Sequence, residues 1–147
     1  MTTMTRRAAI VAVCALALSM TACSNNSGGK IVGKWKVVGG SKQEEMKSMT
    51  DMGAAMYFEF TADSKFKVGF LSINPGNEKL IEVMNNEPSM AAMSGTYSLS
   101  MGDTVNFAGG KGSFGGKDKA TTQFKRNGDK ATMTDPDGTS LDLELVK

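Results

Sequence analysis

The stretch MYFEFTADSKFKVGF, residues 56–70, decides the fold because apolar side chains recur at every second position on both sides of a short turn. Its alternating apolar side chains are Met56, Phe58, Phe60, Phe66, Val68 and Phe70. A period of two is typical of a strand with one buried face, and the residues between the two runs, Ala62-Asp63-Ser64, are common in turns. The stretch therefore predicts an antiparallel hairpin.

The same alternation recurs along the rest of the chain between short turn segments. The predicted strands are 31–38, 56–62, 65–70, 95–100, 103–109, 119–126, 130–135 and 139–146. Such strands must hide both their apolar faces and their unpaired edges, and closure into a ring does both. We therefore expect an all-β fold, an eight-stranded antiparallel up-and-down barrel, with an open sandwich as the structural alternative.

Two segments interrupt the strand pattern and predict short helical insertions. Residues 41–53 open with Ser41 and Glu44 at the spacing of a capping box, which predicts a helix that ends near Gly53. Residues 77–86 predict a second helix before Pro88, with apolar side chains on one side at Leu80, Ile81 and Met84.

The first 22 residues have the pattern of a secretory signal peptide. A polar, basic start that contains Arg6 and Arg7 precedes an uncharged run over residues 8–20. This run is shorter than the ~20 apolar residues that a membrane-spanning helix needs, and its length suits the apolar region of a signal peptide. We therefore expect residues 1–22 to be removed and the mature protein to lie outside the cytoplasm.

Met20-Thr21-Ala22-Cys23 resembles the lipobox of bacterial lipoproteins. The resemblance implies that the Cys23 thiol receives a diacylglyceryl group, that cleavage precedes Cys23 and that its new amine is acylated. Cys23 would then anchor the protein to a membrane, with residues 23–30 as a flexible tether and 31–147 as the folded domain. An ordinary secretory signal cut near Ala22 is the alternative. Because Ser24 and not Asp follows the cysteine, the resemblance favours the outer membrane, facing the periplasm.

The composition excludes several classes of function. The chain has 17 Lys and Arg against 15 Asp and Glu, and the excess lies in Arg6 and Arg7, so the mature domain is neutral. A neutral domain lacks the basic surface that nucleic acid binding needs. There is no histidine, and only Cys23 remains after processing. We therefore expect no disulfide, no cofactor and no catalytic residues.

Gly33-Lys34-Trp35, on the first predicted strand, resembles the Gly-x-Trp signature of lipocalins. The chain is also similar to short planctomycete lipoproteins that begin KIVGKW, as residues 30–35 do. The resemblance implies a lipocalin-like barrel over residues 31–147, in which Gly33 and Trp35 are structural and Trp35 plugs the closed end. The Thr-Asp-Tyr motif of many lipocalins is absent. For the arginine that packs over the tryptophan in that family, the sequence offers only Lys147 at the end of the last strand.

The methionines suggest a binding site. Met46, Met49 and Met52 recur at helical spacing in the first insertion, and Met84 lies in the second. Flexible thioether side chains suit an adaptable apolar lining, so we expect these four residues to bind a ligand where the insertions meet the barrel mouth. Cu(I) coordination is the alternative, although no His or Cys supports a metal site.

Two further patterns resemble ligand loops. Residues 133–144 partly match a calcium loop through Asp135, Asp137, Gly138 and Glu144, but flanking strands predict a hairpin turn there. Residues 109–119 are glycine-rich without the spacing of a phosphate loop.

Two hypotheses for function follow. In the first, the barrel binds a small hydrophobic ligand beneath the methionine-bearing insertions. In the second, aromatic side chains fill the barrel and the protein has a structural or protein-interaction role in the cell envelope.

Overall fold

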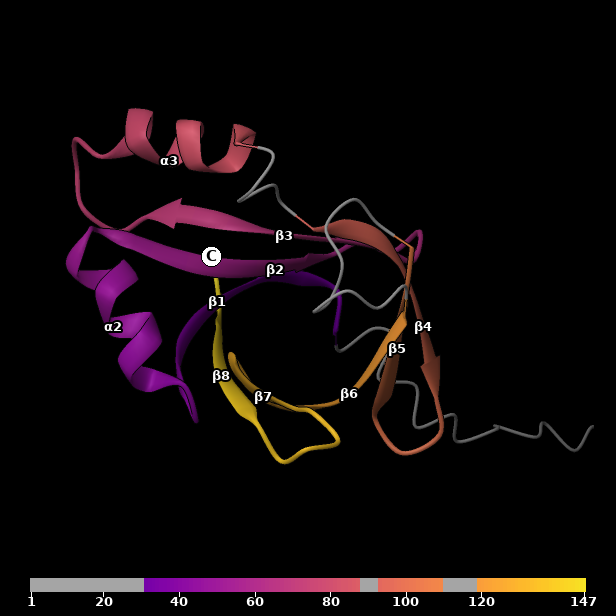
Figure 1. Cartoon of the computed structure of the whole chain (residues 1–147). Helices are drawn as coiled ribbons and strands as arrows, with labels where there is room; N and C mark the ends of the chain where they lie inside the picture. The colour runs from indigo at the N-terminus through magenta and orange to yellow at the C-terminus, as the bar shows by residue number, and fades with distance from the viewer. Residues whose placement is uncertain (1–30, 88–92, 110–118) are drawn as a thin grey trace, which may run out of the picture.

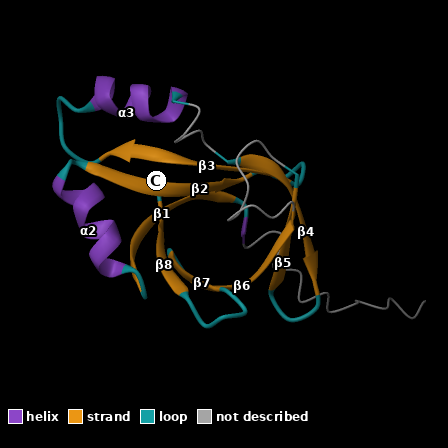
Figure 2. Cartoon of the chain, viewed as in Figure 1, coloured by secondary structure: helices purple, strands orange, loops and turns teal. Residues whose placement is uncertain are grey.

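The computed structural model describes residues 31–87, 93–109 and 119–147, which form a closed eight-stranded antiparallel β-barrel with two short helices beside it (Figures 1 and 2). The predicted fold class is therefore confirmed, and the sandwich alternative is wrong. The predicted signal peptide, the predicted lipidation site Cys23 and the predicted tether at 23–30 lie outside the described residues, as does the glycine-rich segment 110–118.

The elements follow one another as the sequence pattern predicts. They are β1 (Gly33–Gly40), α2 (Gln43–Asp51), β2 (Ala54–Phe60), β3 (Lys65–Ser72), α3 (Glu78–Asn86), β4 (Ser94–Ser100), β5 (Thr104–Ala108), β6 (Lys119–Asn127), β7 (Lys130–Thr134) and β8 (Ser140–Leu145). Each strand pairs antiparallel with the next, and β8 returns to pair with β1. The described strands and the core residues all lie within residues 31–147, the range predicted for the folded domain.

The up-and-down order gives the barrel two different ends. The turns β2–β3, β4–β5 and β6–β7 lie at the end where β1 begins and β8 finishes, and we call this the Trp35 end. The connections that carry α2 and α3, together with the β5–β6 and β7–β8 connections, lie at the other end, which we call the helix end. Both insertions therefore lie at one end of the barrel, as a role around its mouth requires.

The inward-facing side chains form one continuous core. Its buried members are Ile31, Trp35, Val37, Phe58, Phe60, Phe66, Val68, Tyr97, Val105, Phe107, Phe124, Ala131, Met133 and Leu143. All of these strand residues were predicted to face inward from the period of two. Thr122 is buried among them because its hydroxyl donates to the Thr134 carbonyl at 3.0 Å, which satisfies the polar group.

Trp35 closes its end of the barrel, as predicted. The indole is fully buried, and its Nε1 donates a hydrogen bond to the Ile31 carbonyl at 2.8 Å. Gly33 makes room for this arrangement, since it adopts φ +139° and a Cβ there would lie 2.8 Å from the Leu145 side chain. The Gly-x-Trp pattern is thus explained by the packing between the first and last strands.

In lipocalins an arginine packs over the conserved tryptophan, and the prediction that only Lys147 could take this position here is wrong. Arg126, near the end of β6, places its guanidinium carbon 5.0 Å from the centroid of the Trp35 ring. Its Nε also donates to the Gly128 carbonyl at 2.6 Å, which fixes the side chain beside the β6–β7 turn. Lys147 instead forms an ion pair with Asp129 at 2.6 Å. The period of two places Arg126 on the same face as Phe124, but it does not predict the contact with Trp35, because β6 and β1 are not neighbours in the ring.

The predicted capping box of the first helix is also wrong. Helix α2 starts at Gln43, and its N-cap residue Lys42 makes no side-chain cap. The Ser41 hydroxyl instead lies 3.1 Å from the Ser140 hydroxyl and accepts the Ser140 backbone N–H at 3.1 Å. Ser41 therefore ties β1 to β8 and does not begin the helix.

Helix α3 covers the free edge of β3. Strand β3 pairs with β4 only from Lys65 to Lys67, so its second half lacks a neighbouring strand on that side. The Asn85 side chain accepts the Phe70 N–H at 2.9 Å and donates to the Phe70 carbonyl at 3.0 Å, which replaces the missing strand. Ile81 and Met84 are buried against this edge, as predicted.

Leu80 was predicted to share the buried side of this helix, and that prediction is wrong. Its side chain is 46% exposed, because α3 turns Ile81 and Met84 toward Ala54 and Phe70 instead.

Candidate functional site

Aromatic rings occupy the Trp35 end of the barrel interior. The Phe60 ring lies at the centre, with its centroid 5.3 Å from that of Tyr97 and 6.0 Å from that of Phe107. Trp35 and Phe124 meet edge to face at 5.3 Å. Such contacts are typical of a well-packed core and leave few voids larger than a water molecule. This end of the barrel is therefore a packed core.

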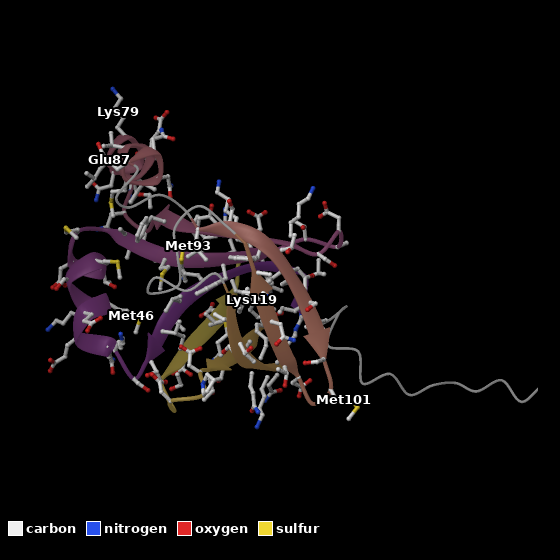
Figure 3. The ribbon with its side chains drawn as sticks, turned by 45° about the vertical axis from the view of Figure 1, so that its right-hand side comes forward. Met46, Lys79, Glu87, Met93, Met101 and Lys119 are labelled. Carbon is white, nitrogen blue, oxygen red and sulfur yellow. The ribbon has the colours of Figure 1, made fainter. Side chains whose placement is uncertain are left out.

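Smaller and more flexible side chains line the helix end. Ala54 is buried there, and Met56 and Leu141 pack against the core while they stay partly exposed. Met46, from α2, also packs against the core, and so does Met93, just before β4. Figure 3 shows Met46 on the barrel side of α2 and Met93 beside the strands, whereas Lys79 and Glu87 lie on α3 away from them.

The four methionines predicted as a binding site are not brought together into one lining. Met46 packs against the main core, and Met49 on the same helix is half-buried. Met52, at the end of α2, is 51% exposed. Met84 belongs to a separate small cluster with Ala54 and Ile81 under α3.

A groove runs between α2 and the outer face of the first two strands. It has a volume of about 430 Å³, and we call it the α2 groove. It is lined by Lys36, Val37, Val38, Gly39, Gln43, Met46, Lys47, Thr50, Ala55 and Ile73. Of the predicted binding residues, only Met46 is part of it.

The floor of the α2 groove is apolar where a solvated barrel would carry polar side chains. Ala55 alternates with the inward Ala54 and Met56, so it faces outward. Its cross-strand partner Leu71 also faces outward but lines a neighbouring groove and not this one. Val38 is 51% exposed, and Ile73 is 38% exposed.

Helix α2 covers this floor loosely. None of its residues is buried, and it packs on β1 and β2 with Met46 half-buried between them. The register of β1 against β8 shifts between Val37 and Gly39, which bends the strand beneath the helix. The loose packing and the bend together leave the groove open.

Two lysines stand at the sides of the α2 groove. Lys36 projects outward from β1, and Lys47 projects from α2. Within the described ranges, neither has a carboxylate within 4.0 Å, although Glu144 stands opposite Lys36 in the β1–β8 register. The groove therefore combines an apolar floor with two cationic groups that form no ion pair there.

A second groove adjoins the first along β1. It measures about 590 Å³ and shares Lys36 and Ile73 with the α2 groove, which makes the two continuous. Its far side holds the ion pair between Asp129 and Lys147, and the side-chain contact with Lys147 lowers the pKa of Asp129. This second groove is more polar, because Asp129 and Glu144 line it.

The segment that partly matches a calcium loop forms a hairpin turn, as predicted. The segment around Asp135 is a tight turn between β7 and β8, in which the Asp135 N–H donates to the Thr139 carbonyl at 2.8 Å. Asp137 accepts the Thr139 N–H at 2.8 Å, which lowers the pKa of its carboxyl group. In the part of the chain that the structure describes, no three His, Cys, Asp or Glu side chains gather where they could hold a metal ion.

Comparisons with known proteins find no match. No family model, no curated protein and no solved structure matches this chain. Among the described residues, no helix has the length and the apolar character needed to cross a bilayer.

Sequence reasoning missed the α2 groove, although a signal was present. Val38, Ala55 and Leu71 fall on the solvent side of their strands by the period of two, and all three are apolar. Apolar residues in outward positions of neighbouring strands indicate a covered face or a binding surface.

Proposed function

We propose that this chain is a membrane-anchored, extracytoplasmic lipoprotein that binds one small molecule with an apolar part in the α2 groove. The lipobox pattern that ends at Cys23 supports the anchor. The closed barrel then serves as a rigid support, and its outer face beside α2 carries the binding surface.

The observation that carries this proposal is the α2 groove with its apolar floor. Its volume of about 430 Å³ falls within the range of about 300 to 1,000 Å³ found for small-molecule sites. The rings that fill the Trp35 end support a site outside the barrel interior, because they leave little room for a ligand there.

Native mass spectrometry of residues 24–147, secreted into a periplasm and kept free of detergent, tests the binding. We expect a non-covalent adduct of a few hundred daltons that is lost on activation. Replacing Val38 with Asp should abolish it, because a carboxylate in the floor opposes burial of an apolar chain. The matched control is Thr96→Asp, on an exposed outward position of β4 away from the groove. A bare protein mass with every variant would contradict the proposal.

The anchor has a separate test. The full chain should fractionate with membranes and take up labelled palmitate, and Cys23→Ser should abolish both. An unchanged membrane fraction for Cys23→Ser would contradict lipidation at this residue.

The filled core favours a second candidate function, a structural or protein-interaction lipoprotein. Leu80 and Val83 give α3 an exposed apolar face, with Val83 56% exposed. A photo-crosslinking residue at position 83 should then capture an envelope protein in cells, whereas one at exposed Met101 should not.

A further inference from the structure

We infer that the α2 groove selects a single-chain anionic amphiphile, with its acid group between Lys36 and Lys47 and its chain on the apolar floor. This inference rests on the proposed function and adds the chemical class of the ligand.

The floor defines the shape of the apolar part. Val38, Met46, Ala55 and Ile73 form one apolar strip along the groove between α2 and the outer face of β1 and β2. Val38 and Ile73 are more than a third exposed, so an alkyl chain would remove apolar surface from water there. A strip in an open groove suits one extended chain better than a rigid ring system.

The charged side chains of the groove indicate the polar part of the ligand. Lys36 lies on one wall and Lys47 on the other, and the described residues offer neither of them an ion pair. Acidic side chains are absent from the lining of this groove. Glu144, opposite Lys36, lines the adjoining groove and would repel an anion there, whereas the Asp129–Lys147 ion pair in that groove carries no net charge. The lysines therefore favour an anionic head at the α2 side.

Two further lining groups support the same orientation. Gln43 and Thr50 lie on the face of α2 that carries Met46 and Lys47. The Gln43 amide can donate hydrogen bonds to a carboxylate, whereas the Thr50 hydroxyl already donates to the Met46 carbonyl at 3.0 Å. Neither side chain brings a negative charge.

The test compares three probes with the same twelve-carbon chain: dodecanoate, dodecanol and dodecyltrimethylammonium. The two charged probes are kept below their micelle concentrations and dodecanol below its solubility limit. Backbone amide shifts of residues 24–147 report the site, and titrations report affinity. We expect dodecanoate to shift Val38, Lys47 and Ile73 and to bind several-fold more tightly than dodecanol. The upper limit is about 25-fold, because each of two exposed charge pairs contributes up to about fivefold.

Charge reversal at Lys47 tests whether this lysine contacts the acid group of the ligand. Lys47→Glu should weaken dodecanoate at least about fivefold, leave dodecanol unchanged and strengthen the cationic probe. The matched control is Lys79→Glu, an exposed lysine on the other nine-residue helix, which should change none of the three affinities.

The outcomes separate this inference from the proposed function. Equal affinities for dodecanoate and dodecanol at the groove would overturn the anionic head and leave the proposed function standing. Probe-induced shifts confined to inward residues such as Thr122 and Phe107 would overturn the groove as the site. No shift with any probe would overturn both.

Discussion

At the Trp35 end of the barrel, tight turns join the strands and rings fill the interior, whereas at the helix end the connections are long and the inward side chains are small or flexible. The first end contains Trp35, Phe60 and Phe124, all nearly inaccessible to solvent. The second contains Ala54 and partly exposed methionines. One end of the same ring of strands thus contributes most of the packing, and the other is free to carry a surface for binding.

The largest expected change in stability comes from a substitution at the packed end of the barrel. Trp35→Ala removes the indole from contact with Phe124 and Arg126 and leaves the Ile31 carbonyl without its donor, so we expect a loss of about 3 to 5 kcal/mol in unfolding free energy. Urea unfolding followed by circular dichroism measures it. Met56→Ala at the helix end should cost less than about 2 kcal/mol, because Met56 is only partly buried. Equal losses would contradict the difference between the ends.

The next effect concerns the free edge of β3. Asn85→Ala removes both hydrogen bonds to the Phe70 backbone, and we expect a loss of about 1 to 3 kcal/mol because those groups become unsatisfied. Hydrogen exchange should accelerate at the Phe70 amide before it does so in β6. Asn86→Ala, at the exposed neighbouring position, is the control and should leave that rate unchanged.

A smaller effect is expected at the outside of the Trp35 end. Arg126→Ala removes the guanidinium from the Trp35 ring and from the Gly128 carbonyl, with an expected loss of about 1 kcal/mol. Arg126→Lys should recover only part of it, because an ammonium group does not stack on the ring as a planar guanidinium does. Met101→Ala is the control, because the Met101 side chain is 94% exposed. If Arg126→Ala shifts the midpoint of urea unfolding no more than this control does, the Arg126 contact does not stabilise the fold.

The smallest effect is a pH dependence at the same end. The ion pair with Lys147 lowers the folded-state pKa of Asp129 below its ordinary value of 3.8. A lowered pKa stabilises the fold above that value, and the gain disappears as the pH falls through the folded pKa. Asp129→Asn should therefore lower the melting temperature slightly at neutral pH and have no effect in strong acid. A difference that persists in strong acid would show that the substitution acts through something other than charge.

The sequence predicted the barrel well because the patterns that specify strands and turns involve residues close together along the chain. A period of two in residues 56–70 determines which side chains face inward, and turn residues such as Gly128 mark the hairpins. The position of Arg126 over Trp35 depends on ring closure, which no local pattern encodes. The same holds for Ser41, whose spacing from Glu44 matches a capping box although its hydroxyl bonds to Ser140.

The candidate site was harder to predict than the fold. Met46 lines the α2 groove, but the spacing of the methionines did not reveal that Met84 packs under the other helix. The sequence patterns did not identify the two lysines of the groove. Only the three-dimensional structure places Lys36 and Lys47 on opposite walls of one groove.

Ring closure also determines the order in which the protein can fold. The hydrogen bond between Ser41 and Ser140 joins residues 99 positions apart, and β1 has no partner on one side until β8 arrives. Contacts between distant residues form slowly, because a long loop must close first. A growing chain therefore carries an open strand edge until its last residues emerge, and such an edge can pair with other chains. The last strand thus protects the first one, and the exposed edge lasts as long as the residues between them take to be made.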